Sequence, residues 1–284
     1  MGDLAARPLL RWAGGKTQLL PQLRPLMPQG FEAYHEPFLG GGAMFFDVIA
    51  SRSVLSDPLV CVLSDSNPEL INCYMQVRDR VADVIATLSA FEISEKAYYG
   101  MRAIEYGQMS QVFSAARTIY LNKLGFNGLF RVNKSGKFNV PWGRWKPDRL
   151  PTVCDEENLR ACSRALWGSC IGAAPFDEAL VAARVAAEKA FVFLDPPYVP
   201  ASKTANFTAY TPGGFGVEDL KLLRNECRRL SKVGAKFMLT NADVPLVRDL
   251  FAEFDIRRVD ARRSINCDGG SRGKVGELVI RNYT

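Results

Sequence analysis

The sequence predicts an α/β protein in which one sheet domain is interrupted by a mostly helical, basic insertion at about residues 68–151. Three observations predict this class. Short apolar runs at 60–63 and 191–194 are typical of buried strands, and each leads to an aspartate. A glycine-rich loop at 40–42 stands between a short strand and a helix. The segment 69–124 has apolar residues at three- and four-residue steps, which indicates helices.

The first part of the sheet domain is expected to contain a strand at 33–37, a helix at 43–52 and a second strand at 60–63. Asn67 and Pro68 are typical of the first residues of a helix. The region 127–145 breaks the helical pattern, and Asn-Lys-Ser-Gly at 133–136 predicts a hairpin turn within it.

After about Pro151 the alternation of strands and helices returns. Strands are expected near 191–194, 236–240, 256–262 and 275–281, and helices near 175–189, 217–232 and 244–254. We therefore expect a sheet domain formed by 1–67 and 152–284, and a second domain formed by 68–151.

The positive charge of the chain is concentrated in the insertion. The net charge of all 284 residues is +6, but the segment 117–149 alone carries eight basic residues against one acid, Asp148, a balance of +7. A positive field confined to one segment favours a polyanionic partner such as nucleic acid.

Composition excludes several other classes. Seven cysteines without a Cys-x-x-Cys pair argue against a disulfide framework and a zinc site, and His35, the single histidine, argues against a multi-histidine metal site. No metal is therefore expected. No apolar run is long enough to span a bilayer, and 1–10 lacks the apolar stretch of a signal peptide. We expect a soluble, cytoplasmic protein that does not bind membranes.

The glycine loop predicts close approach of a ligand to backbone N–H groups at the start of a helix. A dinucleotide fingerprint would need a third glycine where Phe45 stands, which disfavours an NAD-dependent oxidoreductase. Asp65, at the end of the next strand, suits ribose hydroxyls, although a helix N-cap is the commoner role for such a residue.

Near the N-terminus, Gly14-Gly15-Lys16-Thr17 matches only the tail of a phosphate-binding loop, because Leu10 stands where that motif needs glycine. Two interpretations remain open for this segment. Trp12 and Lys16 form the wall of a small-molecule pocket, or the segment is a glycine-rich turn that precedes a helix.

The tetrapeptide Asp195-Pro196-Pro197-Tyr198 follows a buried strand directly. The amino nitrogen of adenine or cytosine is a poor nucleophile, because its lone pair is delocalised into the ring. Hydrogen bonds from its N–H groups to the Asp195 carboxylate and the Pro196 carbonyl would favour a pyramidal nitrogen with its lone pair directed at a methyl group. Tyr198 can stack on the base, and rate enhancement would come from positioning and electrostatics. Taken alone, the four residues are also compatible with a tight loop after a strand.

A cytosine carbon-5 methylase needs a cysteine nucleophile, typically in a Pro-Cys pair. The chain contains no Pro-Cys dipeptide, which favours chemistry at an amino nitrogen.

A series of short segments carries a resemblance to a known family: Arg11-Trp12-Ala13-Gly14-Gly15-Lys16, Glu36-Pro37-Phe38, Tyr120-Leu121-Asn122, Asn127-Gly128-Leu129, Phe138-Asn139-Val140-Pro141, Asp195-Pro196-Pro197-Tyr198, Ala205-Asn206-Phe207-Thr208-Ala209-Tyr210 and Arg262-Arg263-Ser264-Ile265. With these motifs in this order, the chain resembles the Dam-type DNA adenine-N6 methyltransferases of the alpha group, from Leu9 to about Tyr283. The resemblance implies a Rossmann-like, mixed seven-stranded methyltransferase sheet with an inserted, mostly helical DNA-recognition domain.

The resemblance also implies S-adenosylmethionine as the methyl donor. Trp12, Lys16, Asp65 and Asp195 match cofactor-contacting positions of the family, and Phe38 and Gly40 lie in its cofactor loop. The catalytic residues implied are Asp195, Pro196, Pro197 and Tyr198.

The resemblance implies a monomer that is bacterial or phage-encoded. The implied partner is double-stranded DNA, from which the target adenine must be extruded. Arg131 matches the position that reads guanine in GATC, and arginine suits guanine O6 and N7. The other residues expected to bind DNA are Arg11 at the first base pair, Phe126 as a wedge beside the extruded base, Asn127 at the adjacent phosphate or orphan base, Leu129 and Pro141 as apolar base contacts, and Asn139, Arg144 and Trp145. Phe126 and Trp145 stand where the family often has tyrosine.

Three alternatives remain beside adenine methylation in GATC. The protein methylates the N4 atom of cytosine, methylates adenine in a different short site, or binds DNA as a regulator without activity. Asp rather than Ser at position 195 favours adenine through the resemblance. A cognate restriction enzyme is left open, and the loop at 202–216 is expected to act as a lid.

Overall fold

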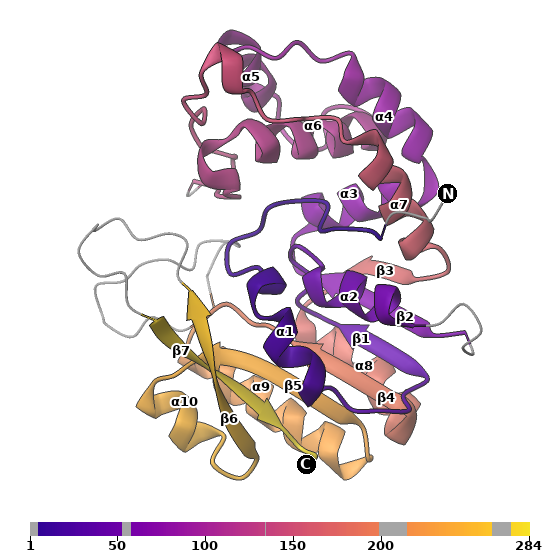
Figure 1. Cartoon of the computed structure of the whole chain (residues 1–284), viewed down its shortest axis with the longest axis vertical. Helices are drawn as coiled ribbons and strands as arrows, with labels where there is room; N and C mark the ends of the chain where they lie inside the picture. Colours follow the sequence, from indigo (N-terminus) through magenta and orange to yellow (C-terminus); the bar gives the residue numbers. More distant parts are fainter. Residues whose placement is uncertain (1–4, 53–57, 134, 199–214, 263–273) are drawn as a thin grey trace.

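The computed structural model describes residues 5–52, 58–133, 135–198, 215–262 and 274–284. They form one seven-stranded sheet covered by helices, with a helical lobe beside it (Figure 1). The strand order is β3-β2-β1-β4-β5-β7-β6; β7 is antiparallel to β5 and β6, and the other neighbouring strands are parallel. The predicted α/β class and the mixed seven-stranded sheet are confirmed.

The bounds of the strands are β1 Ala33–Glu36, β2 Val60–Asp65, β3 Cys170–Ala173, β4 Ala190–Leu194, β5 Lys236–Ala242, β6 Asp255–Arg262 and β7 Lys274–Arg281. The bounds of the α-helices are α1 Leu20–Leu23, α2 Ala43–Ser51, α3 Pro68–Asp79, α4 Val81–Ser89, α5 Glu95–Ala103, α6 Gln111–Leu124, α7 Glu156–Leu166, α8 Phe176–Ala186, α9 Val217–Lys232 and α10 Pro245–Leu250. Short 3-10 helices occur at Lys16–Gln18, Arg24–Leu26, Phe126–Gly128, Pro147–Arg149 and Ala187–Lys189.

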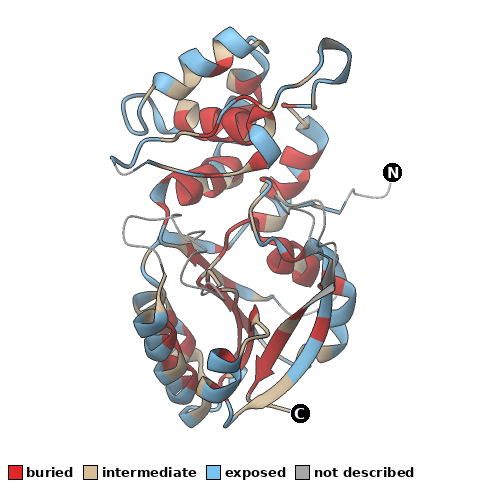
Figure 2. Ribbon diagram, turned by 90° about the vertical axis from the view of Figure 1, so that its left-hand side faces the viewer, coloured by how far each residue is buried: buried red, intermediate tan, exposed pale blue. Residues whose placement is uncertain are grey.

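The central strand β4 is apolar throughout because both of its faces are covered. Phe191 and Phe193 point to the side of α1, α2, α3 and α7, while Val192 and Leu194 point to the side of α8, α9 and α10. Figure 2 shows this arrangement as a buried sheet between helices that are buried on their inner faces and exposed on their outer faces. A carboxylate that follows β4 is therefore held by a rigid, fully buried strand.

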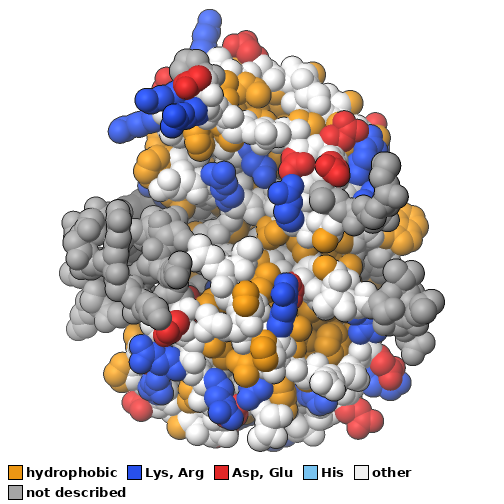
Figure 3. Space-filling model, in the orientation of Figure 1, with side chains coloured by type: hydrophobic (Ala, Val, Ile, Leu, Met, Phe, Trp, Pro, Cys, Tyr) orange, Lys and Arg blue, Asp and Glu red, His pale blue; other side chains and the backbone are white. Residues whose placement is uncertain are grey.

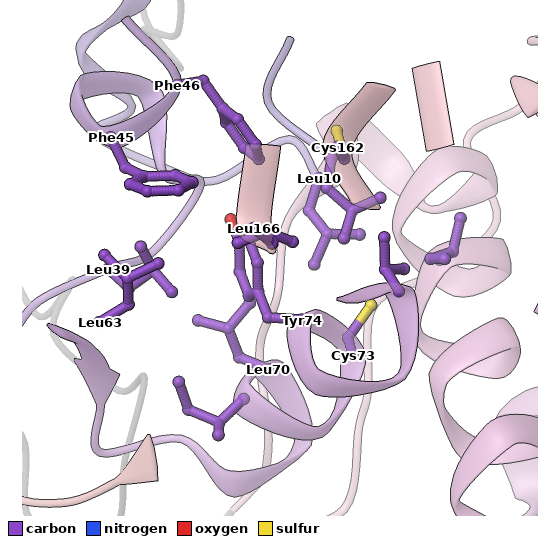
Figure 4. Packing of buried hydrophobic residues seen from close by; sticks show 14 of the residues in the cluster. Leu10, Leu39, Phe45, Phe46, Leu63, Leu70, Cys73, Tyr74, Cys162 and Leu166 are labelled. Atoms are coloured by element: carbon purple, nitrogen blue, oxygen red, sulfur yellow. The ribbon is translucent and has the colours of Figure 1, made fainter. Parts of the chain in front are cut away.

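The helix α3 connects the sheet to the helical lobe. It begins where predicted, since the side chain of Asn67 accepts hydrogen bonds from the backbone N–H groups of Glu69 and Leu70 and caps the helix. Figure 4 shows Tyr74 and Leu70 of this helix directed toward Leu39 and Leu63 of the sheet domain. One hydrophobic core thus continues from the sheet into α4 and α6 of the lobe, and the boundary predicted between 67 and 68 falls at the start of the shared helix.

The periodicity of the sequence does not reveal β3. This edge strand has one half-buried residue, Ile171, and three exposed ones, so it has no apolar pattern. The strands placed near β4, β5, β6 and β7 and the helices placed near α8 and α9 are confirmed. The helix expected at 244–254 is shorter, because α10 ends at Leu250.

His35 lies in β1 and is 4% exposed. Burial lowers its pKa to about 4, and within the described ranges neither ring nitrogen has a hydrogen-bond partner. The histidine is therefore neutral at pH 7 and fills space in the sheet.

Candidate active site

A cavity of about 450 Å³ lies where β1, β2 and β4 end. The carboxyl edge of a parallel sheet is the usual place for a ligand in such folds. The lining comes from the N-terminal segment, the glycine loop, the ends of β1, β2 and β4, and the starts of α8 and α9. It includes Trp12, Lys16, Phe38, Gly40, Asp65, Phe176, Asp177, Asp195, Pro196, Pro197, Tyr198 and Phe215. The structure thus brings together all the residues expected at the catalytic and cofactor positions.

The carboxylate of Asp195 is fixed by two donors from distant elements. Thr240 Oγ1 in β5 donates to Asp195 Oδ1 at 2.7 Å, and Lys16 Nζ lies 2.7 Å from the same oxygen. The side chain of Lys16 is 4% exposed, and its Nζ also donates to the carbonyl of Gly14 at 2.6 Å. Within the described part of the chain both contacts are at Oδ1, so Oδ2 is the oxygen that remains for a ligand N–H group.

Tyr198 is contacted at its hydroxyl and at its ring. Its hydroxyl donates to Glu277 Oε2 at 2.5 Å, and Lys16 Nζ lies 4.9 Å from the centroid of its ring. Burial raises the pKa of Tyr198, and the charges of Asp195 and Glu277 raise it further, so the hydroxyl stays protonated. Sequence reasoning did not identify Glu277, because it lies on β7, remote from the tetrapeptide along the chain.

The glycine loop lies against Trp12. Gly40 has a φ of +47°, and a Cβ atom there would lie 2.8 Å from Trp12 Cδ1, so no larger residue fits. The loop is further fixed through Gly40, whose N–H donates to Asp65 Oδ2 at 3.0 Å and whose carbonyl accepts from the Tyr74 hydroxyl at 3.0 Å. These contacts favour the interpretation of Trp12 and Lys16 as a pocket wall.

Asp65 does not cap α3, since Asn67 does so. Its Oδ1 instead accepts from the backbone N–H of Asn67 at 3.0 Å. Burial raises the pKa of Asp65, with backbone hydrogen bonds acting in the opposite direction. The carboxylate therefore fixes the turn after β2 and at the same time lines the cavity.

Glu36 is a further cavity residue that the sequence did not assign to a role. It is 2% exposed and accepts a hydrogen bond from Tyr34 at 2.7 Å. Burial raises its pKa to about 8; the hydrogen bond from Tyr34 opposes this rise, and the charge of Asp195 adds to it. At pH 7 the side chain is mostly a neutral carboxylic acid.

Aromatic rings form the other end of the cavity. Phe38 stacks on Phe176 with centroids 5.3 Å apart, and Phe215 meets Phe38 edge-on at 6.1 Å. Phe176 and Phe215 were not predicted, because each lies in a loop or at a helix start where it is one apolar residue among many. An apolar slot bordered by Asp65 and Asp177 suits a flat heterocycle with a polar sugar.

The N-terminal segment is clamped to the segment around Asn127. The side chain of Asn122 accepts from Arg11 N at 2.9 Å and donates to the carbonyls of Arg11 and Gly128 at 2.8 and 2.9 Å. Gly128 has a φ of +63°, and a Cβ atom there would lie 2.6 Å from the side chain of Arg11. Arg11 and Asn127, both exposed, therefore belong to one surface.

The predicted turn at 133–136 is confirmed by hydrogen bonds from Asn133 N to the Lys137 carbonyl and from Gly136 N to the Asn133 carbonyl, each 2.9 Å long. Arg131 is exposed at the base of this hairpin. Its Nε donates to Asn139 Oδ1 at 2.7 Å and its Nη2 to the Asn139 carbonyl at 3.3 Å, so the guanidinium is braced from within the hairpin.

The remaining residues expected to bind DNA differ in exposure. Phe126 is 43% exposed, and Pro141 and Arg144 are exposed, while Leu129 is half-buried. Trp145 is half-buried against the core and donates its indole N–H to the carbonyl of Leu124 at 2.8 Å. The indole of Trp145 therefore helps to attach the segment around it to the end of α6.

The charge excess of 117–149 is smaller at the surface than in the sequence. Arg117 is 2% exposed and forms a buried ion pair with Glu69 at 2.8 Å. Lys123 is half-buried, and burial lowers its pKa. Arg131, Lys137, Arg144, Lys146 and Arg149 remain exposed. Figure 3 shows Lys and Arg side chains over both the upper and the lower part of this face, with some of them near the border between the two.

Some expectations lie outside the described residues, namely most of the loop at 202–216, the motif at 205–210, Lys134 and most of 262–265. In the rest of the chain no cluster of His, Cys, Asp and Glu could hold a metal ion. The helices of the described ranges include none with the length and apolarity needed to cross a membrane.

Comparison with known proteins identifies the chemistry. The model of the D12 class N6 adenine-specific DNA methyltransferases matches residues 12–265. The chain is 38% identical to the type II methyltransferase M1.LlaDCHI of Lactococcus lactis subsp. cremoris, over 98% of this chain and 95% of that protein. It is 38% identical to the type II methyltransferase M.MjaIII of Methanocaldococcus jannaschii, over 99% and 100%. It is 33% identical to the DNA adenine methylase of Escherichia coli strain K12, over 96% and 94%.

Proposed function

The chain belongs to the D12 class of N6 adenine-specific DNA methyltransferases, and on that premise we propose that it methylates an adenine extruded from double-stranded DNA, in the sequence GATC. Its enzymatic class is DNA adenine-N6 methyltransferase. The family implies S-adenosylmethionine as the methyl donor. The proposal itself concerns three points: which residues carry each role, the extrusion of the base, and the DNA sequence that is recognised.

The cavity fits the proposed donor in chemistry, and its volume of about 450 Å³ lies in the usual range for small-molecule sites. Its aromatic end, formed by Phe38 and Phe176, matches a flat adenine ring, and Asp65 is placed to accept hydrogen bonds from ribose hydroxyls. The glycine loop, which packs against Trp12 at Gly40, itself lines the cavity. When bound, the donor supplies an electrophilic methyl group on a sulfonium.

Asp195 supports the assignment of the target atom. Its position is fixed by Thr240 and Lys16, so the remaining oxygen can accept an N–H group of the base without rearrangement of the site. The Pro196 carbonyl is the second acceptor proposed, and Tyr198 stacks on the base. The observation that carries the proposal is this preoriented carboxylate in the cavity shared with the glycine loop.

The recognition side of the proposal rests on exposed residues of the clamped surface. Arg131 is exposed and braced, which suits a two-pronged contact with guanine. Phe126 exposes its ring and can fill the gap that an extruded adenine leaves. Arg11, Asn127, Leu129, Asn139, Pro141, Arg144 and Trp145 complete the proposed DNA-binding set. We propose that one chain suffices, because it carries the cavity and the hairpin together.

Expression of the protein in a bacterial strain without DNA methylation, followed by sequencing of its DNA for modified bases, tests the proposal. We expect N6-methyladenine in GATC on both strands. Methyladenine at another short site would overturn the assignment of GATC alone, and N4-methylcytosine would overturn the proposed target base. A matched strain that expresses the Asp195→Ala variant gives the background.

A further inference from the structure

We propose that Phe130 is a positioning residue shared by the donor cavity and the base-reading hairpin, so that occupation of the cavity and recognition of the DNA site are energetically linked. The inference rests on the proposed function, since it concerns the two sites assigned there. Phe130 is not among the described residues that line the cavity, so its effect on the donor is indirect.

Phe130 lies between two other rings. Its ring stacks on Trp12 with centroids 5.3 Å apart and planes 26° apart, and it meets Phe138 edge-on at 5.6 Å and 63°. Phe130 is 6% exposed, so the contacts are shielded from water. Aromatic pairs in these geometries stabilise a structure by more than the area that they bury.

The Trp12 end of this row reaches the donor cavity. Trp12 lines the cavity and lies so close to Gly40 that a Cβ atom there would clash with the indole. A tilt of the indole would therefore displace the glycine loop or narrow the cavity. Phe130 opposes that tilt because it occupies the stacking face of the indole.

The Phe138 end of the row reaches the base-reading hairpin. Phe138 pairs with Val132 across the hairpin, and the next residue, Asn139, braces the guanidinium of Arg131. Phe130 thus directly precedes Arg131, the proposed guanine reader, and Phe138 directly precedes Asn139, which orients it.

A second connection runs beside the first. Asn122 ties the backbone of Arg11 to that of Gly128, which fixes the segment before Trp12 to the segment before Phe130. The N-terminal segment and the hairpin are thus connected both through the Trp12–Phe130 stack and through Asn122. A donor that orders Trp12 therefore also favours the hairpin conformation that binds DNA. Binding linkage is reciprocal, so DNA must strengthen donor binding by the same factor.

The test measures binding of S-adenosylhomocysteine to the purified full chain by calorimetry, with and without a GATC duplex. In Phe130→Leu, the dissociation constant without DNA is expected to rise about two- to tenfold, the range for loss of one aromatic pair. The factor by which the duplex tightens this binding is expected to fall toward one. Phe130→Tyr, which keeps the ring, is expected to restore part of both values.

Phe113→Leu is the matched control, because Phe113 packs on Phe91 within the same lobe at 5.3 Å and has no ring contact with Trp12. It is expected to lower stability and to leave both binding values within twofold of the wild type. Wild-type binding values in Phe130→Leu, or an equal loss in Phe113→Leu, would overturn the inference. A wild-type protein that does not bind S-adenosylhomocysteine would instead overturn the proposed donor cavity.

Discussion

The sheet edge that carries Asp195 and the hairpin that carries Arg131 hold their side chains in different ways. Asp195 is fixed by Lys16 and Thr240, which are 4% and 0% exposed and come from opposite ends of the chain. Arg131 is exposed and is fixed by Asn139, eight residues further along the same hairpin. The first arrangement needs the whole fold, and the second needs only a local turn.

This difference separates chemistry from recognition. A change at Asp195 removes a preoriented carboxylate and leaves Lys16, whose side chain is 4% exposed, without its ion-pair partner, which is costly. A change in the hairpin alters an exposed contact that the rest of the fold does not depend on. We therefore expect changes at the sheet edge to affect turnover and changes in the hairpin to affect the choice of sequence.

The largest effect is expected from Asp195→Ala. Loss of the proposed acceptor should reduce methyl transfer by at least about 10²–10³-fold, the scale for removal of one preorganised hydrogen-bonding group. Binding to a GATC duplex should stay within a few-fold. Incorporation of labelled methyl groups and fluorescence anisotropy measure the two values.

Asp243→Asn is the control for Asp195→Ala, because Asp243 follows the adjacent strand β5 but pairs with Arg248 and Arg258. It is expected to retain turnover within about twofold, the scale of an exposed ion pair. Undiminished methyl transfer by Asp195→Ala would remove the proposed role of the carboxylate.

Arg131→Ala should relax the choice of sequence at one guanine. The expected loss of discrimination at that base pair is about 1–3 kcal/mol, with turnover on GATC affected less than by Asp195→Ala. Competition between GATC and duplexes substituted at each position measures it. In Lys137→Ala, from the same hairpin, binding should weaken evenly across sequences. A specificity profile identical to that of the wild type would show that Arg131 does not read a base.

Glu277→Ala should reduce turnover less, because Glu277 acts through Tyr198. Loss of the hydrogen bond to the Tyr198 hydroxyl is expected to cost about 1 kcal/mol, roughly fivefold in rate. Glu277→Gln should retain more activity, since its amide oxygen still accepts. In a Tyr198→Phe background, Glu277→Ala should have no further effect. Additive losses in the double variant would contradict the proposed connection.

The smallest effect on turnover at pH 7 is expected from Glu36→Gln, because the carboxyl group is already mostly neutral there, but the effect on stability depends on pH. The pKa of Glu36 is about 8 in the folded protein against an ordinary value of 4.5, so the folded state holds a proton that the unfolded state releases. Stability from this group is therefore present at low pH and is lost as pH rises through about 8. Relative to the wild type, Glu36→Gln should gain thermal stability between pH 5 and pH 8. If the difference in melting temperature between Glu36→Gln and the wild type stayed constant from pH 5 to pH 8, the burial of a neutral carboxyl group would be contradicted.

Much of the fold and part of the site follow from local sequence. The run that forms β4 and the aspartate after it are adjacent in the chain, so the position of Asp195 at the end of a strand was predictable. The helix start at Asn67 and the turn at 133–136 were predictable for the same reason, since each depends on the conformation of a few neighbouring residues. The edge strand β3 was not, because an exposed strand has no apolar periodicity.

The sequence by itself determined which residue types stand at strand ends, in the glycine loop and in the basic insertion, because these are properties of short segments. Only the tertiary structure decided that Glu277 meets Tyr198, that Phe130 stacks on Trp12, and that Arg117 is withdrawn from the surface into an ion pair with Glu69. Each of these contacts joins elements far apart in the chain. Their formation depends on which faces pack together to bury the core, and no local pattern contains that information.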